Sequence, residues 1–217
     1  MCGRFTLIDW EEMVERFGVA AEGIKPRYNI APTQSTPVII HENGPHLQMA
    51  RWGLVPFWAK ELSFGAKLIN ARAETVHENN YFRHSLKVKR CLIPADGFYE
   101  WKKDGTVKKP YRFTLQDKEI FAFAGLWDQW RSPNGDDIIS FTIITTTANA
   151  LVHEVHDRMP VILTKEAEQI WLDSRFQDHE TLRELLVPYA ATKMGISMVS
   201  PLVNTPNNDN PDVLRIT

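Results

Sequence analysis

The chain has 217 residues, of which 43% are hydrophobic and 24% are charged, and its net charge is −2. This composition is that of an ordinary single-domain globular protein, and it excludes a chain that coats nucleic acid through overall positive charge. Two cysteines are too few for a disulfide framework and fit a reducing compartment. Neither a signal peptide nor an apolar run near the ~18 residues of a membrane span is recognisable, so we expect a cytoplasmic protein.

The N-terminal part contains one predicted helix. Asp9, followed three residues later by Glu12, predicts a helix start, and Gly18 predicts its end. The next segment, RYNIAPTQ (27–34), contains a proline and predicts a loop.

The middle of the chain is rich in predicted strands. Their apolar patterns cover 35–41, 46–53, 67–72, 89–101, 110–115, 119–126 and 137–147, with a turn at Asp104 and Gly105. Helices are expected at 148–155, 165–174 and 178–186, whereas 204–212 (NTPNNDNPD) favours turns over packed structure. Many strands with a few peripheral helices indicate an α+β fold with a mainly antiparallel, barrel-like sheet, in a single domain over 1–217.

Cys2 stands directly after the initiator methionine in MCGRFTL. Without Met1 it would carry a 1,2-aminothiol, whose amine forms an imine with an aldehyde and whose thiol then closes a thiazolidine ring. An α-amine with a pKa of about 7.7–8.0 is roughly a tenth neutral at pH 7, whereas a lysine amine near 10.4 is almost fully protonated. Position 2 alone is equally consistent with a small, partly buried residue of a first strand. Cys91 lies in an apolar strand pattern and is predicted to be an inert core thiol.

Three segments place polar residues against apolar runs: LINARAE (68–74), ADGFYEW (95–101) and HDRMPVIL (156–163). Together with MCGRF, RYNIAP and RWGLVPFWA they resemble the SRAP family, the SOS response-associated peptidases, and VSPLVN (199–204) adds weaker support. The resemblance implies the SRAP fold and a protein that binds abasic sites in single-stranded DNA and joins itself to the ring-opened sugar through Cys2. It also implies that the protein removes Met1 by autoproteolysis. Removal of Met1 by an aminopeptidase is equally consistent with the sequence.

The resemblance implies three further catalytic residues. Asn70 would orient the sugar and the N-terminal amine, and Glu100 would move a proton between the amine and the sugar oxygen. His156 would protonate the sugar oxygen and help to reopen the ring when the crosslink reverses. Without the resemblance, Asn70 is equally a turn residue, Glu100 a surface strand residue, and His156 a core or capping histidine.

An abasic site offers no base to read, so we expect binding to depend on phosphate contacts and base stacking. The residues that the resemblance implies for DNA binding are Arg4, Arg72 and Arg158 for phosphates, Asn29, Pro32, Phe57 and Trp58 for loops that wedge against neighbouring bases, and Thr145 for a backbone contact. Thr146 and Thr147 are adjacent alternatives to Thr145, and Trp52, Phe57 and Trp58 taken singly also fit a core. Six lysines are predicted to be solvated surface: Lys87, Lys89, Lys102, Lys103, Lys108 and Lys109.

No metal and no cofactor is expected, because the run 153–157 lacks the i, i+4 histidine pair of a helical zinc site. The expected partner is abasic single-stranded DNA, bound by a monomer that associates with the nucleoid. One alternative is an N-terminal-nucleophile amidohydrolase, since glutamine amidotransferases of one class also begin Met-Cys-Gly and use the Cys2 thiol. Another is a noncatalytic single-strand-binding module, which needs no free Cys2.

Overall fold

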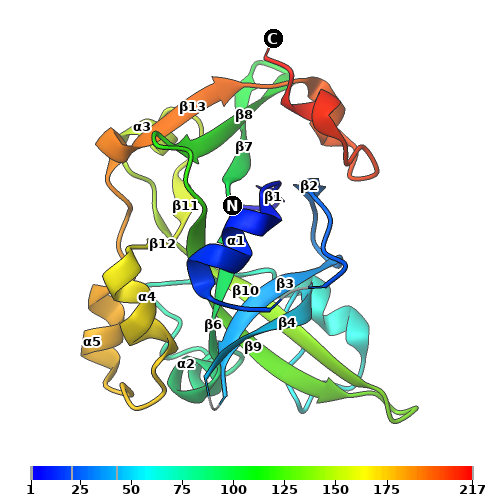
Figure 1. The fold of residues 1–217 in the computed structure, drawn as a ribbon, viewed down its shortest axis with the longest axis vertical. Helices are drawn as coiled ribbons and strands as arrows, with labels where there is room; N and C mark the ends of the chain where they lie inside the picture. Colours follow the sequence, from blue (N-terminus) through cyan, green and yellow to red (C-terminus); the bar gives the residue numbers. More distant parts are fainter. Residues whose placement is uncertain (1, 21, 43, 217) are drawn as a thin grey trace.

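The computed structural model describes residues 2–20, 22–42 and 44–216 (Figure 1). The strands are β1 Phe5–Leu7, β2 Arg27–Ile30, β3 Ser35–His41, β4 Pro45–Trp52, β5 Asn70–Arg72, β6 Arg90–Ala95, β7 Gly97–Asp104, β8 Val107–Leu115, β9 Phe121–Arg131, β10 Asp137–Thr147, β11 Arg158–Pro160, β12 Ile162–Leu163 and β13 Met194–Met198. The α-helices are α1 Trp10–Phe17, α2 Arg83–Val88, α3 Ala150–His153, α4 Lys165–Leu172 and α5 His179–Glu184, and the 3-10 helices are η1 Leu62–Lys67, η2 Ala191–Lys193, η3 Pro201–Asn204 and η4 Pro211–Leu214. Within the described ranges, no helix is long and apolar enough to cross a membrane.

The strands form two sheets. In the larger sheet, β10, β4, β3, β6 and β9 follow one another, and the pairing of β9 with β10 closes them into a barrel. The smaller sheet has the order β13-β8-β7-β1-β2. The ladders are antiparallel except where β10 pairs with β4 and with β5. The predicted α+β class with a mainly antiparallel, barrel-like core is therefore confirmed.

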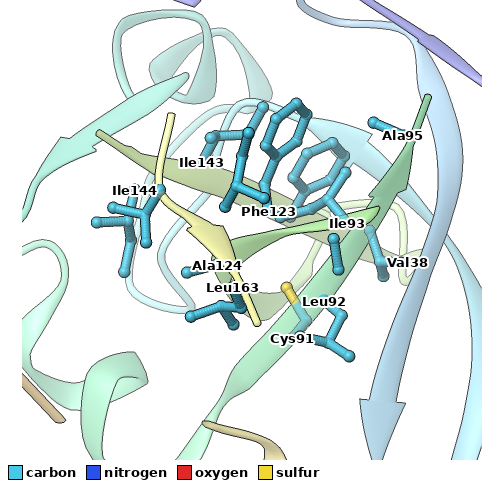
Figure 2. Close-up of a cluster of buried hydrophobic side chains, with 14 of the residues drawn as sticks. Val38, Cys91, Leu92, Ile93, Ala95, Phe123, Ala124, Ile143, Ile144 and Leu163 are labelled. Carbon is cyan, nitrogen blue, oxygen red and sulfur yellow. The ribbon is translucent and has the colours of Figure 1, made fainter. Parts of the chain in front are cut away.

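Aliphatic and aromatic side chains fill the barrel (Figure 2). Val38, Phe123 and Ile143 are fully buried, and burial of such side chains stabilises the fold by roughly 1.5–3 kcal/mol each. Cys91 is also buried in this core, as predicted. Its cross-strand partner is Gly125, where an added Cβ would lie 2.1 Å from Ile93 Cδ1 and 2.9 Å from Cys91 Sγ, so these two side chains fill the space that the glycine leaves open.

Helix α1 has the predicted ends. The Asp9 carboxylate accepts a hydrogen bond from Glu12 N at 3.1 Å, and Gly18 adopts the left-handed conformation that stops the helix. The hairpin turn at Asp104 and Gly105 also forms, with Gly105 at a φ of 60°. Local capping and turn chemistry was therefore sufficient to predict these features.

The single strand predicted at 89–101 was wrong. It divides at Asp96 into β6, which belongs to the barrel, and β7, which belongs to the smaller sheet. The Asp96 carboxylate accepts hydrogen bonds from Thr6 Oγ1 and Ile8 N and pairs with Arg112 at 2.8 Å. This polar junction fixes the point at which the chain passes from one sheet to the other.

One further prediction was wrong and another was right only in part. Residues 27–30 form strand β2, which pairs with β1, rather than part of a loop. The segment 204–212 contains the predicted turns. It is nevertheless held against the fold, because η3 at its start and η4 at its end lie against β8 and β2. In Figure 1 this red C-terminal segment closes over the end of the smaller sheet.

Candidate functional site

Cys2 lies where the two sheets meet. Strand β1 pairs with β7, with Phe5 opposite Phe98, and the ladder continues through a hydrogen bond from Tyr99 N to Arg4 O at 2.9 Å. The residues before Arg4 therefore run alongside Glu100. From the barrel side, Asn70 Nδ2 donates to the Cys2 carbonyl oxygen at 2.8 Å. Cys2 is completely buried and thus held by both sheets, while Met1 lies outside the described residues.

Asn70 and Glu100 bring buried polar atoms to Cys2. The Asn70 Oδ1 atom is buried and accepts no hydrogen bond from the described residues. Glu100 is 2% exposed, and burial raises its pKa to about 7. Burial, together with the nearby Glu100 charge, raises the pKa of the Cys2 thiol well above its usual range. The thiol is therefore protonated at rest, beside a carboxyl group that exchanges protons near neutral pH.

His156 precedes β11, and Asp157 next to it lies close enough to Glu100 to raise the pKa of that carboxyl. His156 Nδ1 lies 3.0 Å from Arg158 N and 2.8 Å from Asp157 Oδ1. When Nδ1 is unprotonated it accepts a hydrogen bond from the Arg158 amide, and when it is protonated it donates one to the Asp157 carboxylate. The surroundings of His156 therefore accommodate both of its protonation states. Burial lowers the pKa of His156, and the Asp157 charge opposes this. The structure thus brings the segment around His156 to the same site.

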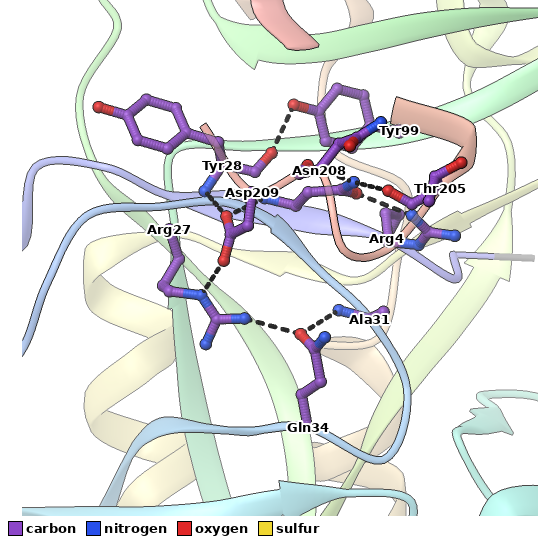
Figure 3. Close-up of polar contacts among 10 residues, drawn as sticks. Arg4, Arg27, Tyr28, Ala31, Gln34, Tyr99, Thr205, Asn208 and Asp209 are labelled. Carbon is purple, nitrogen blue, oxygen red and sulfur yellow. Dashed lines mark hydrogen bonds and ion pairs between the residues drawn. The ribbon is translucent and has the colours of Figure 1, made fainter. Parts of the chain in front are cut away.

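Arg4 is held by neutral groups (Figure 3). Its Nη1 donates to Asn29 Oδ1 and to Val203 O, each at 2.8 Å, and its guanidinium lies 5.7 Å from the Trp101 ring centre. Burial lowers the pKa of Arg4. No carboxylate is among the described hydrogen-bond partners of this side chain, so Arg4 keeps positive charge available near Cys2.

Asn29 is part of this support and does not present its side chain to solvent. It is fully buried, and its Nδ2 donates to the carbonyl oxygens of Val203, Thr205 and Asn208. The Asn29 amide thus holds Arg4 and the C-terminal segment, and the role of its loop against neighbouring bases stays a prediction. Pro32 is partly buried in the turn that follows β2.

The C-terminal segment was missed as a component of the site. The Asp209 carboxylate accepts hydrogen bonds from Tyr28 N at 2.6 Å and Asn29 N at 2.9 Å, and it pairs with Arg27 (Figure 3). These contacts join residues about 180 positions apart, so no local sequence pattern could predict them. They hold the C-terminal segment against β2, whose Asn29 contacts Arg4.

The other two arginines have different environments. On β10, Thr145 lies opposite Arg72 of β5. Its backbone carbonyl oxygen accepts a hydrogen bond from Arg158 Nη2 at 2.6 Å. Thr145 is fully buried, and its hydroxyl donates to Ala71 O at 3.4 Å. Its contact with DNA stays a prediction. Arg158 is largely buried and forms two contacts with Glu74, at 2.5 and 3.0 Å. Arg72 is exposed, which leaves it the more accessible cation.

An aromatic loop follows β4. Phe57 and Trp58 are 59% and 47% exposed, and Trp58 stacks on Tyr81 with ring centres 5.9 Å apart. The loop backbone is fixed, because Phe57 N donates to the buried Asp128 carboxylate at 2.9 Å and Trp130 Nε1 donates to the Ala59 oxygen at 2.6 Å. These aromatic rings are thus displayed on a rigid support, whereas Trp52 is a core residue.

Lys89 also differs from its prediction as solvated surface. It forms an ion pair with Asp128 at 2.5 Å and lies 5.3 Å from the Trp127 ring centre. In the part of the chain that the structure describes, no group of three or more His, Cys, Asp or Glu side chains is arranged to hold a metal ion.

Comparison with known proteins places this site in context. The model of the SOS response associated peptidase (SRAP) family matches residues 1–206. The Abasic site processing protein YoqW of Bacillus subtilis (strain 168) is 47% identical over 222 residues, and the match covers 99% of each chain. The Abasic site processing protein HMCES of Xenopus tropicalis is 32% identical, over 88% of this chain and 66% of its own length.

Solved structures show the same fold. A protein from Bacteroides thetaiotaomicron superposes with a TM-score of 0.90 at 28% identity, and the match covers 100% of both chains. A protein from Bordetella bronchiseptica gives a TM-score of 0.78 at 29% identity, over 92% of this chain and 100% of its own.

Proposed function

Since the chain belongs to the SOS response associated peptidase family, we propose that it processes abasic sites in DNA, by binding the single strand around the lesion and crosslinking to it through Cys2. Relatives that match it over nearly their whole length are named abasic site processing proteins. The observation that carries the chemistry is the position of Cys2, whose carbonyl is held by Asn70 and whose thiol lies in the field of the buried Glu100.

The first step requires a free α-amine on Cys2, and therefore the loss of Met1, by autoproteolysis or by another peptidase. The neutral amine attacks the C1′ aldehyde of the ring-opened abasic sugar, and one water leaves as the imine forms. The unpaired Asn70 Oδ1 supplies an acceptor for the amine hydrogens. His156, through its two protonation forms, donates the proton that opens the sugar ring and takes part again on reversal.

In the second step, the Cys2 sulfur adds to the imine carbon and closes the thiazolidine. The thiol proton has to leave as the carbon–sulfur bond forms, and the imine nitrogen has to gain one. Glu100, with a pKa of about 7, can accept the thiol proton and supply a proton to the nitrogen, so no external buffer is needed. The net change is protein plus DNA minus one water.

DNA is held by charge and by stacking. Arg72 and Arg4 provide cations next to Asn70 and Cys2 for phosphates that flank the lesion. Phe57 and Trp58 present exposed ring faces on which bases stack without sequence preference. Arg158 supports this surface through Glu74 and Thr145, and Asn29 and Pro32 shape the turn beside it.

The test is a denaturing gel after incubation with single-stranded oligonucleotides that do or do not contain one abasic site. We expect a heat-resistant shifted band with the abasic strand alone. Shifted bands with both strands, or with neither, would contradict the proposal. Turnover of glutamine or of a peptide amide in the absence of a shifted band would instead favour the amidohydrolase alternative.

A further inference from the structure

The hairpin formed by β7 and β8 places lysines directly opposite lysines. Lys102 pairs with Lys109 and Lys103 pairs with Lys108, and all four are exposed. Like charges in directly opposed positions of a sheet are destabilising. The sequence predicted these lysines only as solvated surface, because the strands predicted at 89–101 and 110–115 end before they reach them.

This hairpin tip stands apart from the rest of the smaller sheet. Strand β13 accompanies β8 from Leu115 to Tyr111, and Val199 N then bonds to the Pro110 oxygen. Beyond Pro110, the residues up to Val107 pair with β7 and with no other described strand. The tip is therefore a two-stranded ribbon, which is marginally stable alone and accessible from both faces.

The two lysine pairs lie on different faces. Side chains alternate along a strand, so Lys102 shares the face of Phe98 and Glu100. Along this face, the residues change from 0% exposed at Phe98 and 2% exposed at Glu100 to an exposed side chain at Lys102. Lys102 and its partner Lys109 thus stand where the space between the two sheets opens to solvent, two residues or about 7 Å beyond the site carboxyl.

The opposite face belongs to the C-terminal segment. There, Tyr99 is buried against Val203 and Val213, and Trp101 Nε1 donates to Asn204 Oδ1 at 2.7 Å. Lys103 and Lys108 continue this outer face and point away from Glu100. The hairpin therefore contains two lysine pairs on opposite faces, and the Lys102–Lys109 pair, which shares its face with Asp104, faces the site.

One acidic residue moderates the positive charge. Asp104 forms an ion pair with Lys109 at 2.6 Å, and the nearby Lys102 charge also lowers the pKa of Asp104. Four lysines and one aspartate leave the ribbon with a net charge of about +3, in a chain whose overall charge is −2. Such a local field attracts a polyanion whose charges are spaced along a chain.

We propose that the Lys102–Lys109 face of this hairpin binds the sugar-phosphate backbone of the DNA strand on one side of the lesion. The inference rests on the proposed function, which it extends by giving the DNA a direction: the backbone leaves the site along the inner face of β7 and β8. The hairpin is thus a binding arm with no part in the chemistry at Cys2.

The test measures equilibrium binding to oligonucleotides that carry a tetrahydrofuran analogue, which has no aldehyde and forms no crosslink. Two strands of about twelve nucleotides are compared, with the analogue near the 5′ end in one and near the 3′ end in the other. In the double variant Lys102→Ala, Lys109→Ala, we expect weaker binding of only one of the two strands. For that strand, the magnitude of the negative slope of log affinity against log salt should decrease by about 1.4. The loss of affinity between 50 and 200 mM salt should then be about sevenfold smaller than for the wild type.

The matched control is the double variant Lys103→Ala, Lys108→Ala, which removes the same charge from the same ribbon on the outer face. It should bind both strands with nearly wild-type slopes. Equal losses in both double variants, or losses for both strand orientations, would indicate general attraction and overturn the proposal. Unchanged binding in both double variants would overturn it as well.

A gain of affinity provides a second test that a folding defect cannot imitate. Asp104→Asn removes the only acidic side chain of the ribbon, so it should bind the affected strand more tightly and with a steeper salt dependence. Weaker or unchanged binding would count against the proposal. Crosslinking of true abasic strands by the wild-type chain, followed on the same samples, shows separately whether the proposed function holds.

Discussion

The interior of the barrel and the site between the two sheets differ in how their buried groups are satisfied. In the barrel, Phe123 and Ile143 lie among other apolar side chains (Figure 2). Around Cys2, by contrast, Glu100 is buried as a carboxyl group and Asn70 Oδ1 accepts no described hydrogen bond. Burying such groups costs free energy, whereas apolar packing supplies it. Apolar packing in the barrel therefore stabilises the fold, and this stabilisation offsets the cost of burying Glu100 and Asn70 beside Cys2.

The two cysteines, one in each region, give the largest expected contrast. Cys2→Ala should abolish the durable crosslink, because the step that closes the thiazolidine ring needs the thiol. Cys91→Ala should retain the crosslink and lower the free energy of unfolding by about 1 kcal/mol, the usual effect of a small deletion in a packed core. Crosslink yield on denaturing gels and urea unfolding are the measurements. A Cys2→Ala protein with a wild-type yield of durable adduct would refute the assigned roles.

Glu100→Gln should slow crosslink formation by roughly 10²–10⁴-fold at pH 7, the range for loss of a general acid or base. Binding of a strand with the tetrahydrofuran analogue should change little, since the substitution leaves in place the arginines that we propose to bind phosphates. Single-turnover crosslinking at saturating DNA separates the two quantities. A rate within tenfold of wild type would mean that Glu100 only positions the sugar.

The same variant should alter how stability depends on pH. Burial raises the pKa of Glu100 from 4.5 to about 7, so the folded state binds more protons than the unfolded state between these values. Stability from this group is thus lost as pH rises through that window, by up to about 3 kcal/mol. Urea unfolding at pH 4 and pH 8 should show that Glu100→Gln loses correspondingly less stability than wild type. Parallel pH profiles would show that Glu100 titrates normally.

Trp58→Ala tests the rigid aromatic surface. Loss of one stacked base costs about 1–3 kcal/mol of binding free energy, and stacking releases no counterions. Affinity for single-stranded DNA should therefore fall while the salt slope stays the same. Phe64, which lies behind Trp58 with ring centres 5.7 Å apart, offers a control, because Phe64→Leu should have a smaller effect. A changed slope for Trp58→Ala would indicate that the DNA path itself had moved.

The arginines should show the smallest effect. Arg72→Ala should lower the salt slope by about 0.7, the contribution of one phosphate contact on a single strand. Arg158→Ala should chiefly reduce stability, because it leaves Glu74 without its partner at 2.5 Å. Salt titrations and urea unfolding on both variants distinguish these outcomes. The reverse pattern would show that Glu74 gives way to DNA and that Arg158 is the phosphate ligand.

Sequence reasoning was accurate where structure is decided locally. The strands at 35–41 and 137–147 have the predicted bounds, and the cap at Asp9 and the stop at Gly18 form as expected. Strands β2 and β13 were missed, because each depends on a partner strand that supplies its ladder.

The site was predictable only as a set of residues. Its members Cys2, Asn70 and Glu100 lie close together, but the environment of each DNA-binding candidate depends on distant partners. Asn29 is buried by carbonyl groups 174 to 179 positions later, and Arg158 is held by Glu74, 84 positions earlier. No composition or periodicity encodes such contacts, so buried and accessible arginines look alike in sequence.

The central claim is that the chemistry belongs to the free aminothiol of Cys2 rather than to a reactive thiol alone. The most direct measurement is the mass of the adduct formed with an abasic oligonucleotide by a protein whose N-terminus begins at Cys2, compared with a version that carries a removable N-terminal extension. We predict an adduct of protein plus DNA minus one water for the free terminus, none for the extended protein despite normal DNA binding, and recovery once the extension is cleaved. An extended protein that forms the same durable adduct at a similar rate would contradict the aminothiol mechanism.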